Sequence, residues 1–303
     1  MAGDTYSGQS PLSCVTDWIS RYDRILFPAP ALLVVFGMLV FPVVYTLYLS
    51  LQEWSGGVRP PVFVGLDNYR TMLHEGRFWG SVWRTAYFTG LAVTSQLLLG
   101  LIAALAFNRA FLGRGVARTL FLFPMVATPA AMALVWKFML DPTLGIIGHL
   151  LKSVGLPPIL WISDEKWVIP AMALVDTWSW TPLVMIIVLA GLAALPNEPY
   201  EAARIDGASS ARAFFSITLP LLRPALMVAL MFRVIDAIKT FDIIIVITQG
   251  GPNYASEILN VYAFSESLNY FHFGYGSALL VALGVMVFVV AIVCSQFRRG
   301  GYY

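Results

Sequence analysis

The chain has 303 residues, of which 58% are hydrophobic and only 12% are charged, and its net charge at pH 7 is +2. Soluble globular domains carry about 25% charged residues, so the composition excludes an ordinary soluble protein and predicts an integral membrane protein. The small net charge indicates no class of partner.

Apolar runs predict the membrane spans, because a helix needs about 20 apolar residues to cross the hydrocarbon layer of a bilayer. Five runs are free or nearly free of charged residues, and a sixth is apolar but carries four charges. The sequence therefore predicts an all-α polytopic membrane protein with six transmembrane helices. Their expected ranges are 25–51, 85–108, 119–139, 167–195, 224–248 and 274–297.

The distribution of Lys and Arg predicts the orientation, since these residues are enriched in cytoplasmic loops. The segment 108–118, NRAFLGRGVAR, has three Arg and no acid, whereas the loop 248–275 has two Glu and no base. This pattern predicts a permease domain over 25–297 with a cytoplasmic loop at 196–223. The tails 1–24 and 298–303 are both expected to be cytoplasmic.

Three long segments fall on the opposite side of the predicted topology, at 53–83, 141–166 and 248–275. Each mixes Gly, Pro and aromatic residues, as in GGVRPPVFVGLDNY and TQGGPNYAS, a composition typical of folded loops and not of disordered ones. An extracytoplasmic partner can dock on such loops.

Residues for catalysis, nucleotide hydrolysis or metal binding are not recognisable in the sequence. A phosphate-binding P-loop needs Gly directly before Lys, but the four lysines follow Trp136, Leu151, Glu165 and Ile238. His74, His149 and His272 are isolated in the predicted outer loops, without a second ligand at metal-binding spacing. We expect no metal site, no catalytic residue and no cofactor bound by this chain.

The segment 201–220, EAARIDGASSARAFFSITLP, is unusually polar for its place between two apolar spans. It predicts two short helices. Pro199 lies in the first turn of the first helix, and Gly207 ends that helix in a left-handed cap. The second helix begins near Ser209 or Ser210 and is expected to be broken by Pro220. The alanines leave little side-chain bulk, so another protein can approach the backbone closely.

This segment also carries a spaced pattern: E-A-A, three residues, G, nine residues, I, one residue, L-P. The pattern resembles the cytoplasmic loop of ABC importer permeases. FVGLDNY, FRVIDAIKTFD, and TQGGP followed by YGSALL are similar to the carbohydrate branch of that family, which includes maltose and glycerol-3-phosphate permeases. The resemblance extends over nearly the whole chain from residue 24. The matching loop residues are Glu201, Ala202, Ala203, Gly207, Ile217, Leu219 and Pro220.

The resemblance implies a type I ABC importer permease fold in the bacterial cytoplasmic membrane. It implies three partners: a second permease, expected to be a different chain, a dimer of ABC ATPases that bind ATP and Mg²⁺, and an extracytoplasmic solute-binding protein. The expected function is import of a sugar, glycoside, polyol or glycerol derivative by alternating access. In this scheme Glu201 is a polar anchor for the ATPase, and Gly207 provides the turn.

Asp176 and four charged residues of the fifth span fall well inside predicted spans, where charges are costly and usually functional. Asp176 in the fourth span and Arg233 in the fifth lie at a similar depth, so they can pair. Arg233, Asp236, Lys239 and Asp242 recur every three residues, so they cannot all face one pathway. Two interpretations stay open for these residues: a substrate pathway, or a ladder of ion pairs that fixes the fifth span.

Trp178 and Trp180 are a second candidate lining of the pathway, because an indole ring suits a sugar ring. They lie beside Pro182 in the fourth span. Side chains two residues apart on a helix point about 200° apart, so at most one of the two lines the path.

Two other classes of function remain as alternatives. One is a polytopic membrane enzyme in which Asp176, Asp236 and Asp242 act as acid and base groups. The other is an ion-coupled secondary transporter in which the same acids carry protons. Both leave the polar loop 201–220 without a purpose.

Overall fold

The structure is a computed structural model that describes residues 27–57, 60–157 and 159–299. The predicted tail 1–24 lies outside the described residues, and so do residues 300–303 of the predicted C-terminal tail. Within the described parts nearly all of the regular secondary structure is helical, as the apolar composition predicts.

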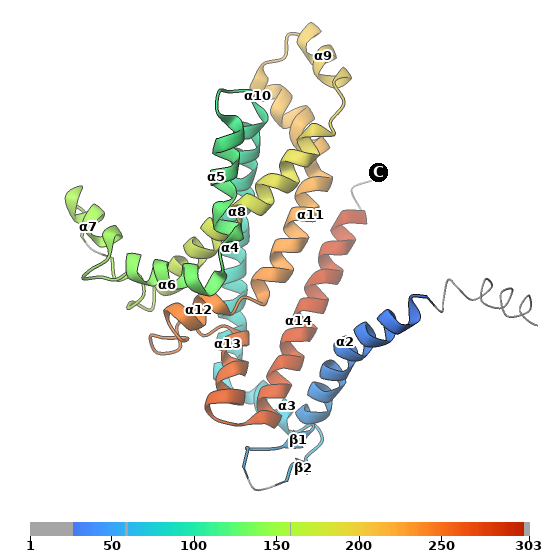
Figure 1. Ribbon diagram of the computed structural model, residues 1–303, viewed down its shortest axis with the longest axis vertical. Coiled ribbons are helices and arrows are strands. Elements are labelled where there is room, and N and C mark those ends of the chain that lie inside the picture. Colours follow the sequence, from blue (N-terminus) through green and yellow to red (C-terminus); the bar gives the residue numbers. More distant parts are fainter. Residues whose placement is uncertain (1–26, 58–59, 158, 300–303) are drawn as a thin grey trace, which may run out of the picture.

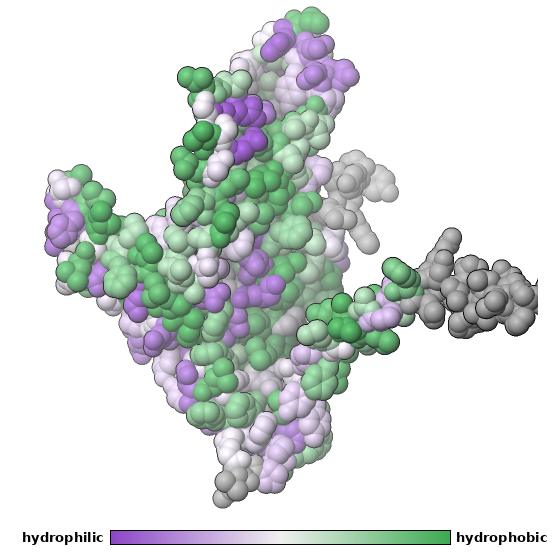
Figure 2. Space-filling view, in the orientation of Figure 1, coloured by the Kyte–Doolittle hydropathy of each residue, from purple (hydrophilic) through white to green (hydrophobic). Residues whose placement is uncertain are grey.

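Five helices are long and apolar enough to cross a membrane, and a bent pair makes a sixth span if its two halves are counted together. Figure 1 shows that most of these helices run in the long direction of the molecule, with α2 leaning outward beside α14. Figure 2 shows hydrophobic surface over much of their length. The single helices are α2 (Ala29–Ser50), α4 (Gly76–Asn108), α8 (Val168–Ala193), α11 (Leu219–Ile238) and α14 (Phe273–Arg299), and the pair is α5 (Arg114–Val126) with α6 (Pro129–Met139).

The described connections between the long helices are folded, as predicted for the segments 53–83, 141–166 and 248–275. Strands β1 (Gln52–Glu53) and β2 (Val62–Phe63) pair antiparallel, with Gln52 opposite Phe63. In Figure 1 the helix α9 lies at one end of the molecule, and β1, β2 and α3 lie at the opposite end. The other short helices are α3 (Asp67–His74), α7 (Ile146–Ser153), α9 (Glu198–Ile205), α10 (Ser210–Ala213), α12 (Asp242–Ile247) and α13 (Leu259–Phe264), with π-helical turns η1 (Phe214–Thr218) and η2 (Ser265–Asn269).

Small residues lie in the contact between α4 and α8, which is the most extensive contact between two helices in the described parts. Ala92 and Ala104 on α4 are fully buried. A Cβ atom built on Gly100 would come within 2.5 Å of the Cγ1 atom of Val184. Helices in a membrane pack mainly through such close contact, because lipid provides no hydrophobic driving force between them.

We expect Gly100→Ala to destabilise the chain by about 1–3 kcal/mol, the usual cost of overpacking a tight contact. Gly90→Ala is the matched control on the same helix, since a Cβ at Gly90 meets nothing within 4 Å. Both changes gain the same helix propensity, so the difference between them isolates the clash. Thermal unfolding in detergent micelles measures it, and equal midpoints for the two variants would contradict the packing argument.

The helix that contains the second predicted span begins before that span. Helix α4 starts at Gly76 and not at residue 85, because it continues through Arg77 and Arg84. These two arginines end the uncharged run in the sequence, but in the structure Arg77 forms ion pairs with Glu257 and Glu266. Charged residues that are paired with acids are compatible with a partly buried helix. A search for uncharged runs in the sequence does not detect such pairing.

The third span is bent, whereas the sequence predicted one uninterrupted helix over 119–139. Helices α5 and α6 meet at an angle of 96°. Between them Ala127 and Thr128 are extended, with ψ of 147° and 125°. Pro129 explains the break, since proline disfavours the helical conformation at the residue before it.

The fifth span also differs from its predicted range, 224–248. The chain is helical from Ser210 to Ile238 through α10, η1 and α11, and it then breaks at residues 239–241 before α12. The prediction that Pro220 breaks the second loop helix is wrong. Pro220 lies in the first turn of α11, directly after η1, where the wider π-helical turn already interrupts the regular hydrogen-bond pattern.

Candidate functional site

The first half of the polar loop is a capped helix that ends in a tight turn. Pro199 occupies the first turn of α9. Gly207 has φ of +70°, which confirms the predicted left-handed cap. The amides of Gly207 and Ala208 donate to the carbonyl oxygens of Arg204 and Ala203, at 3.1 and 2.9 Å. The turn therefore satisfies carbonyl groups at the end of α9 and reverses the chain direction.

The second half begins at Ser209, as predicted. Its hydroxyl accepts a hydrogen bond from the amide of Arg212 at 3.3 Å and so caps α10. Tyr200 on α9 donates from its hydroxyl to that of Thr218 at 3.0 Å, and Thr218 is buried. This bond joins the two halves of the loop. The pattern in the sequence does not include Tyr200 or Thr218, so it gave no signal for this contact.

The pattern residues divide between an exposed surface and a partly buried anchor. Two apolar side chains near the exposed pattern residues are also exposed to solvent: Ile205 is 88% exposed and Phe215 is 66% exposed. Exposed apolar side chains next to a glycine turn suit a protein partner. The exposed members are Glu201, Ala202, Gly207 and Pro220, and the partly buried ones are Ala203, Ile217 and Leu219.

A buried polar cluster joins three helices deep in the molecule. Arg233 on α11, Asp176 on α8 and Gln96 on α4 are at most 1% exposed. Arg233 donates to Asp176 Oδ2 at 2.9 Å and to Gln96 Oε1 at 2.7 Å. Gln96 donates from its amide nitrogen to the same Asp176 oxygen at 2.7 Å. The predicted pairing of Asp176 with Arg233 is confirmed. Gln96 was missed, although an amide inside an apolar run is a visible signal.

The charges in this cluster do not balance. Arg233 also pairs with Asp236 one turn later on α11, and the Asp236 side chain is 46% exposed. One cation therefore serves two carboxylates, and the excess negative charge lies at the more exposed one. The buried Asp176 Oδ1 has no hydrogen-bond partner among the described residues. The guanidinium carbon of Arg233 lies 4.7 Å from the ring centroid of Trp180, within the range of a cation–π contact.

The two tryptophans of α8 lie on different cavities. Trp180 lines a cavity of about 400 Å³ in the elbow between α5 and α6, together with Ser179 and Ile243. Trp178 lines a separate apolar groove. Its ring packs edge-on against the ring of Trp136, with 5.6 Å between the ring centroids. The prediction that the two side chains point in different directions is confirmed.

Of the four charges that one open interpretation arranged as a ladder of ion pairs, only Arg233 and Asp236 form ion pairs among the described residues. Lys239 ends α11, and Asp242 begins α12 on the other side of the break. Both side chains are exposed, and neither forms an ion pair with any residue that the structure describes. The break after α11 explains this, because it takes Asp242 out of the helical register of Arg233 and Asp236.

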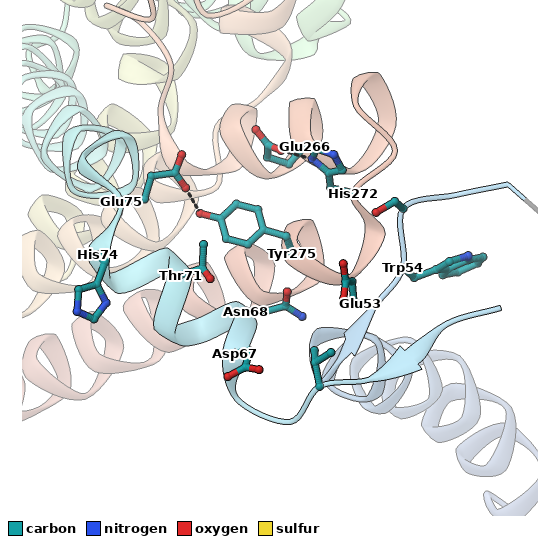
Figure 3. Close-up of a pocket in the computed structure, with 12 residues that line it drawn as sticks. Glu53, Trp54, Asp67, Asn68, Thr71, His74, Glu75, Glu266, His272 and Tyr275 are labelled. Atoms are coloured by element: carbon teal, nitrogen blue, oxygen red, sulfur yellow. Dashed lines mark hydrogen bonds and ion pairs between the residues drawn. The ribbon is translucent and has the colours of Figure 1, made fainter. Parts of the chain in front are cut away.

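A polar cavity of about 770 Å³ opens at the end of the molecule opposite α9. In Figure 3 the side chains of α3 and α14 meet there, and Tyr275 points at Glu75. Among the described residues, four carboxylates and no Lys or Arg line it. His272 contacts Glu266 at 2.9 Å, so it is not isolated as the sequence suggested. The lining acids are Glu53, Asp67, Glu75 and Glu266.

Comparison with known proteins shows the family to which this chain is similar. Residues 96–299 match the family described as "Binding-protein-dependent transport system inner membrane component". The chain is 38% identical over 276 residues to the trehalose/maltose transport system permease protein MalF of Thermococcus litoralis, which covers 89% of this chain and 92% of the relative. It is 34% identical over 290 residues to the sulfoquinovosyl glycerol transport system permease protein SmoG of Agrobacterium fabrum, over 94% of each.

The fold is also found in a solved structure. A chain of a bacterial alginate ABC transporter, crystallised in complex with an alginate pentasaccharide-bound periplasmic protein, has a TM-score of 0.80 to this chain. The identity is 19%, over 94% of this chain and 98% of that one. By sequence and fold, this chain belongs to the family of inner membrane components of binding-protein-dependent transport systems.

Proposed function

We propose that this chain is a permease subunit of an ABC importer and that it moves a sugar, glycoside, polyol or glycerol derivative into the cytoplasm by alternating access. The two relatives named above carry trehalose/maltose and sulfoquinovosyl glycerol in their names. The observation that carries the proposal is the exposed hairpin of α9 and α10, which turns at Gly207 with φ of +70°. A hairpin of this kind can receive force from a partner that hydrolyses ATP.

Three partners complete the proposed transporter. A dimer of ABC ATPases binds the hairpin and carries ATP and Mg²⁺, so this chain needs no cofactor of its own. A second permease, expected to be a different chain, encloses the pathway together with this one. An extracytoplasmic solute-binding protein docks on the outer loops. The alginate transporter of similar fold was crystallised in complex with a periplasmic protein. The polar outer cavity lies in the region of the outer loops (Figure 3).

The proposed pathway passes the elbow cavity and the buried cluster. Non-helical backbone at membrane depth is tolerated where it lines a cavity, and the elbow between α5 and α6 is such a place. Trp180 offers a flat apolar face to a sugar ring, and Asp236 offers a half-exposed carboxylate to its hydroxyl groups. Arg233 contacts both of these groups, and Asp176 pairs in turn with Arg233.

Other residues predicted for the path have different places in the proposal. Lys239 and Asp242, exposed beside the break after α11, are polar groups that a substrate meets further along the path. Trp178 supports the packing of α8 against Trp136. It is therefore the member of the tryptophan pair that does not line the path.

Reconstitution in liposomes tests the function. The chain with its second permease, the ATPase pair and the binding protein is expected to concentrate sugar only when ATP is supplied. A proton-coupled carrier would keep working when ATP is depleted and the proton gradient is held, and an enzyme would convert the solute. Accumulation of a solute by the purified chain alone would contradict the proposal.

A further inference from the structure

A second arginine-centred network lies at the outer end of the molecule, remote from the hairpin. The side chain of Arg77, near the start of α4, is 21% exposed. It donates to both carboxylate oxygens of Glu257, at 2.8 and 2.7 Å, and to Glu266 Oε1 at 2.9 Å. The two glutamate side chains are only 3% and 9% exposed. Arg77 thus joins α4 to two segments that follow it by about 180 residues.

Both faces of this guanidinium are covered as well. Its central carbon lies 4.3 Å from the ring centroid of Tyr254 and 4.3 Å from that of Tyr262. Burial raises the pKa of Tyr262, so its hydroxyl stays protonated and donates to Glu75 at 2.8 Å. Tyr275 donates to the same Glu75 oxygen. The Arg77 side chain is therefore held on its edges by carboxylates and on its faces by aromatic rings.

Two hydrogen bonds extend from this network toward the buried cluster. The amide of Leu259 donates to Thr85 Oγ1 at 2.9 Å, which fixes the start of α13 to α4. The side chain of Asn260 donates to the carbonyl oxygen of Lys239 at 2.8 Å. Lys239 caps α11, the helix that carries Arg233. The outer loop is thus bonded to the end of the helix that holds the proposed pathway.

We propose that Arg77 is a positioning residue that makes residues 249–260 move as one unit with α4, so that movement of the outer loop reaches Lys239 and the Arg233 cluster. Helix α4 also contacts the Arg233 cluster directly, because it carries Gln96, whose side chain accepts a hydrogen bond from Arg233. The inference rests on the proposed function, in which a solute-binding protein docks on the outer loops and this docking changes the conformation of the residues that line the pathway.

The chemistry of arginine explains why this residue is needed. A guanidinium binds a carboxylate through two parallel hydrogen bonds and still has donors for a second acid. Lysine keeps the charge but lacks this planar fork, so it can hold Glu257 and Glu266 only loosely. Loss of the cation leaves the Glu257 carboxylate buried without a partner, which favours opening of the loop.

Hydrogen exchange of the full chain in lipid nanodiscs tests the inference. In Arg77→Gln we expect amides in 249–258 to exchange on the order of 100-fold faster, and amides in 239–241 about tenfold faster. Asn260→Ala cuts the link to Lys239 alone, so it should speed exchange at 239–241 and leave 249–258 unchanged. Arg70→Gln, at an exposed arginine on α3, is the control and should change neither segment.

Faster exchange confined to 249–258 in Arg77→Gln would show a merely local role and overturn the inference. If that variant does not fold, the double variant Arg77→Gln with Glu257→Gln removes these two charges, leaves Glu266 its contact with His272, and is judged by the same two segments. In the assembled transporter, Asn260→Ala and Arg77→Lys are each expected to slow import about tenfold. A wild type that imports nothing refutes the proposed function, whereas variants that import as well as the wild type refute only this inference.

Discussion

Arg233→Ala is expected to destabilise the chain by about 3–5 kcal/mol, the usual cost of leaving a buried charge without its partner. The substitution removes the cation from the Asp176 carboxylate, which is 1% exposed. It also removes the donor to Gln96. Because the three residues belong to α4, α8 and α11, we expect these helices to loosen together. Thermal unfolding and yield of the purified chain in detergent measure the effect.

The matched control is Lys239→Ala, at the C-cap of the same helix. Lys239 is exposed and forms no ion pair with the described residues, so its loss should change stability by less than about 0.5 kcal/mol. Equal unfolding midpoints for the two variants would show that the Arg233 cluster contributes no more than a surface charge.

A double variant, Asp176→Asn with Arg233→Gln, separates the two interpretations of the cluster. It removes both buried charges and keeps hydrogen-bonding groups, so most of the lost stability should return. Import should nevertheless stay roughly tenfold below the wild type, because Asp236 loses the cation that holds it and Trp180 loses its cation–π partner. Wild-type import by this variant would show that the cluster only braces the helices.

Gly207→Pro is expected to reduce ATP-driven import by about 100-fold, at the upper end of typical coupling effects between sites. Proline fixes φ near −65°, whereas Gly207 has φ of +70°. The turn after α9 therefore cannot form, and the hydrogen bond from the Ala208 amide to the Ala203 carbonyl is lost. The chain should still insert, since the turn lies outside the spans, and the ATPase pair should still hydrolyse ATP.

Gly207→Ala provides the graded control. A Cβ at this position meets nothing within 4 Å, so alanine pays only the cost of a left-handed backbone, roughly 1–2 kcal/mol. Import and ATP hydrolysis by the reconstituted complex are compared for both variants. Undiminished import by the proline variant would remove the hairpin from the coupling mechanism.

Local patterns predicted the hairpin well and the exact limits of the spans less well. The left-handed turn follows from a glycine at the end of an eight-residue helix, and the chain around Gly207 folds as expected. Pro220 illustrates the limit of such rules. A proline breaks a regular helix, but here the π-helical turn before it accommodates it, and such a turn leaves no simple mark in the sequence.

Charged residues caused the other differences. Arg77 and Arg84 end an uncharged run, yet α4 includes both, because acids from a distant loop neutralise Arg77. Conversely, the four charges after residue 232 recur with helical spacing, yet the break at 239–241 divides them. At Arg77 the partners that decide the outcome lie far away in the sequence.

The sequence by itself determined that this is a membrane chain of several apolar helices with a polar hairpin, because hydropathy over about 20 residues and turn chemistry are local properties. Only the tertiary structure decided that Gln96, Asp176 and Arg233 meet, and that Arg77 reaches Glu257. Those pairs are separated by 57 to 180 positions along the chain. Their contact depends on how whole helices pack, which no local pattern specifies.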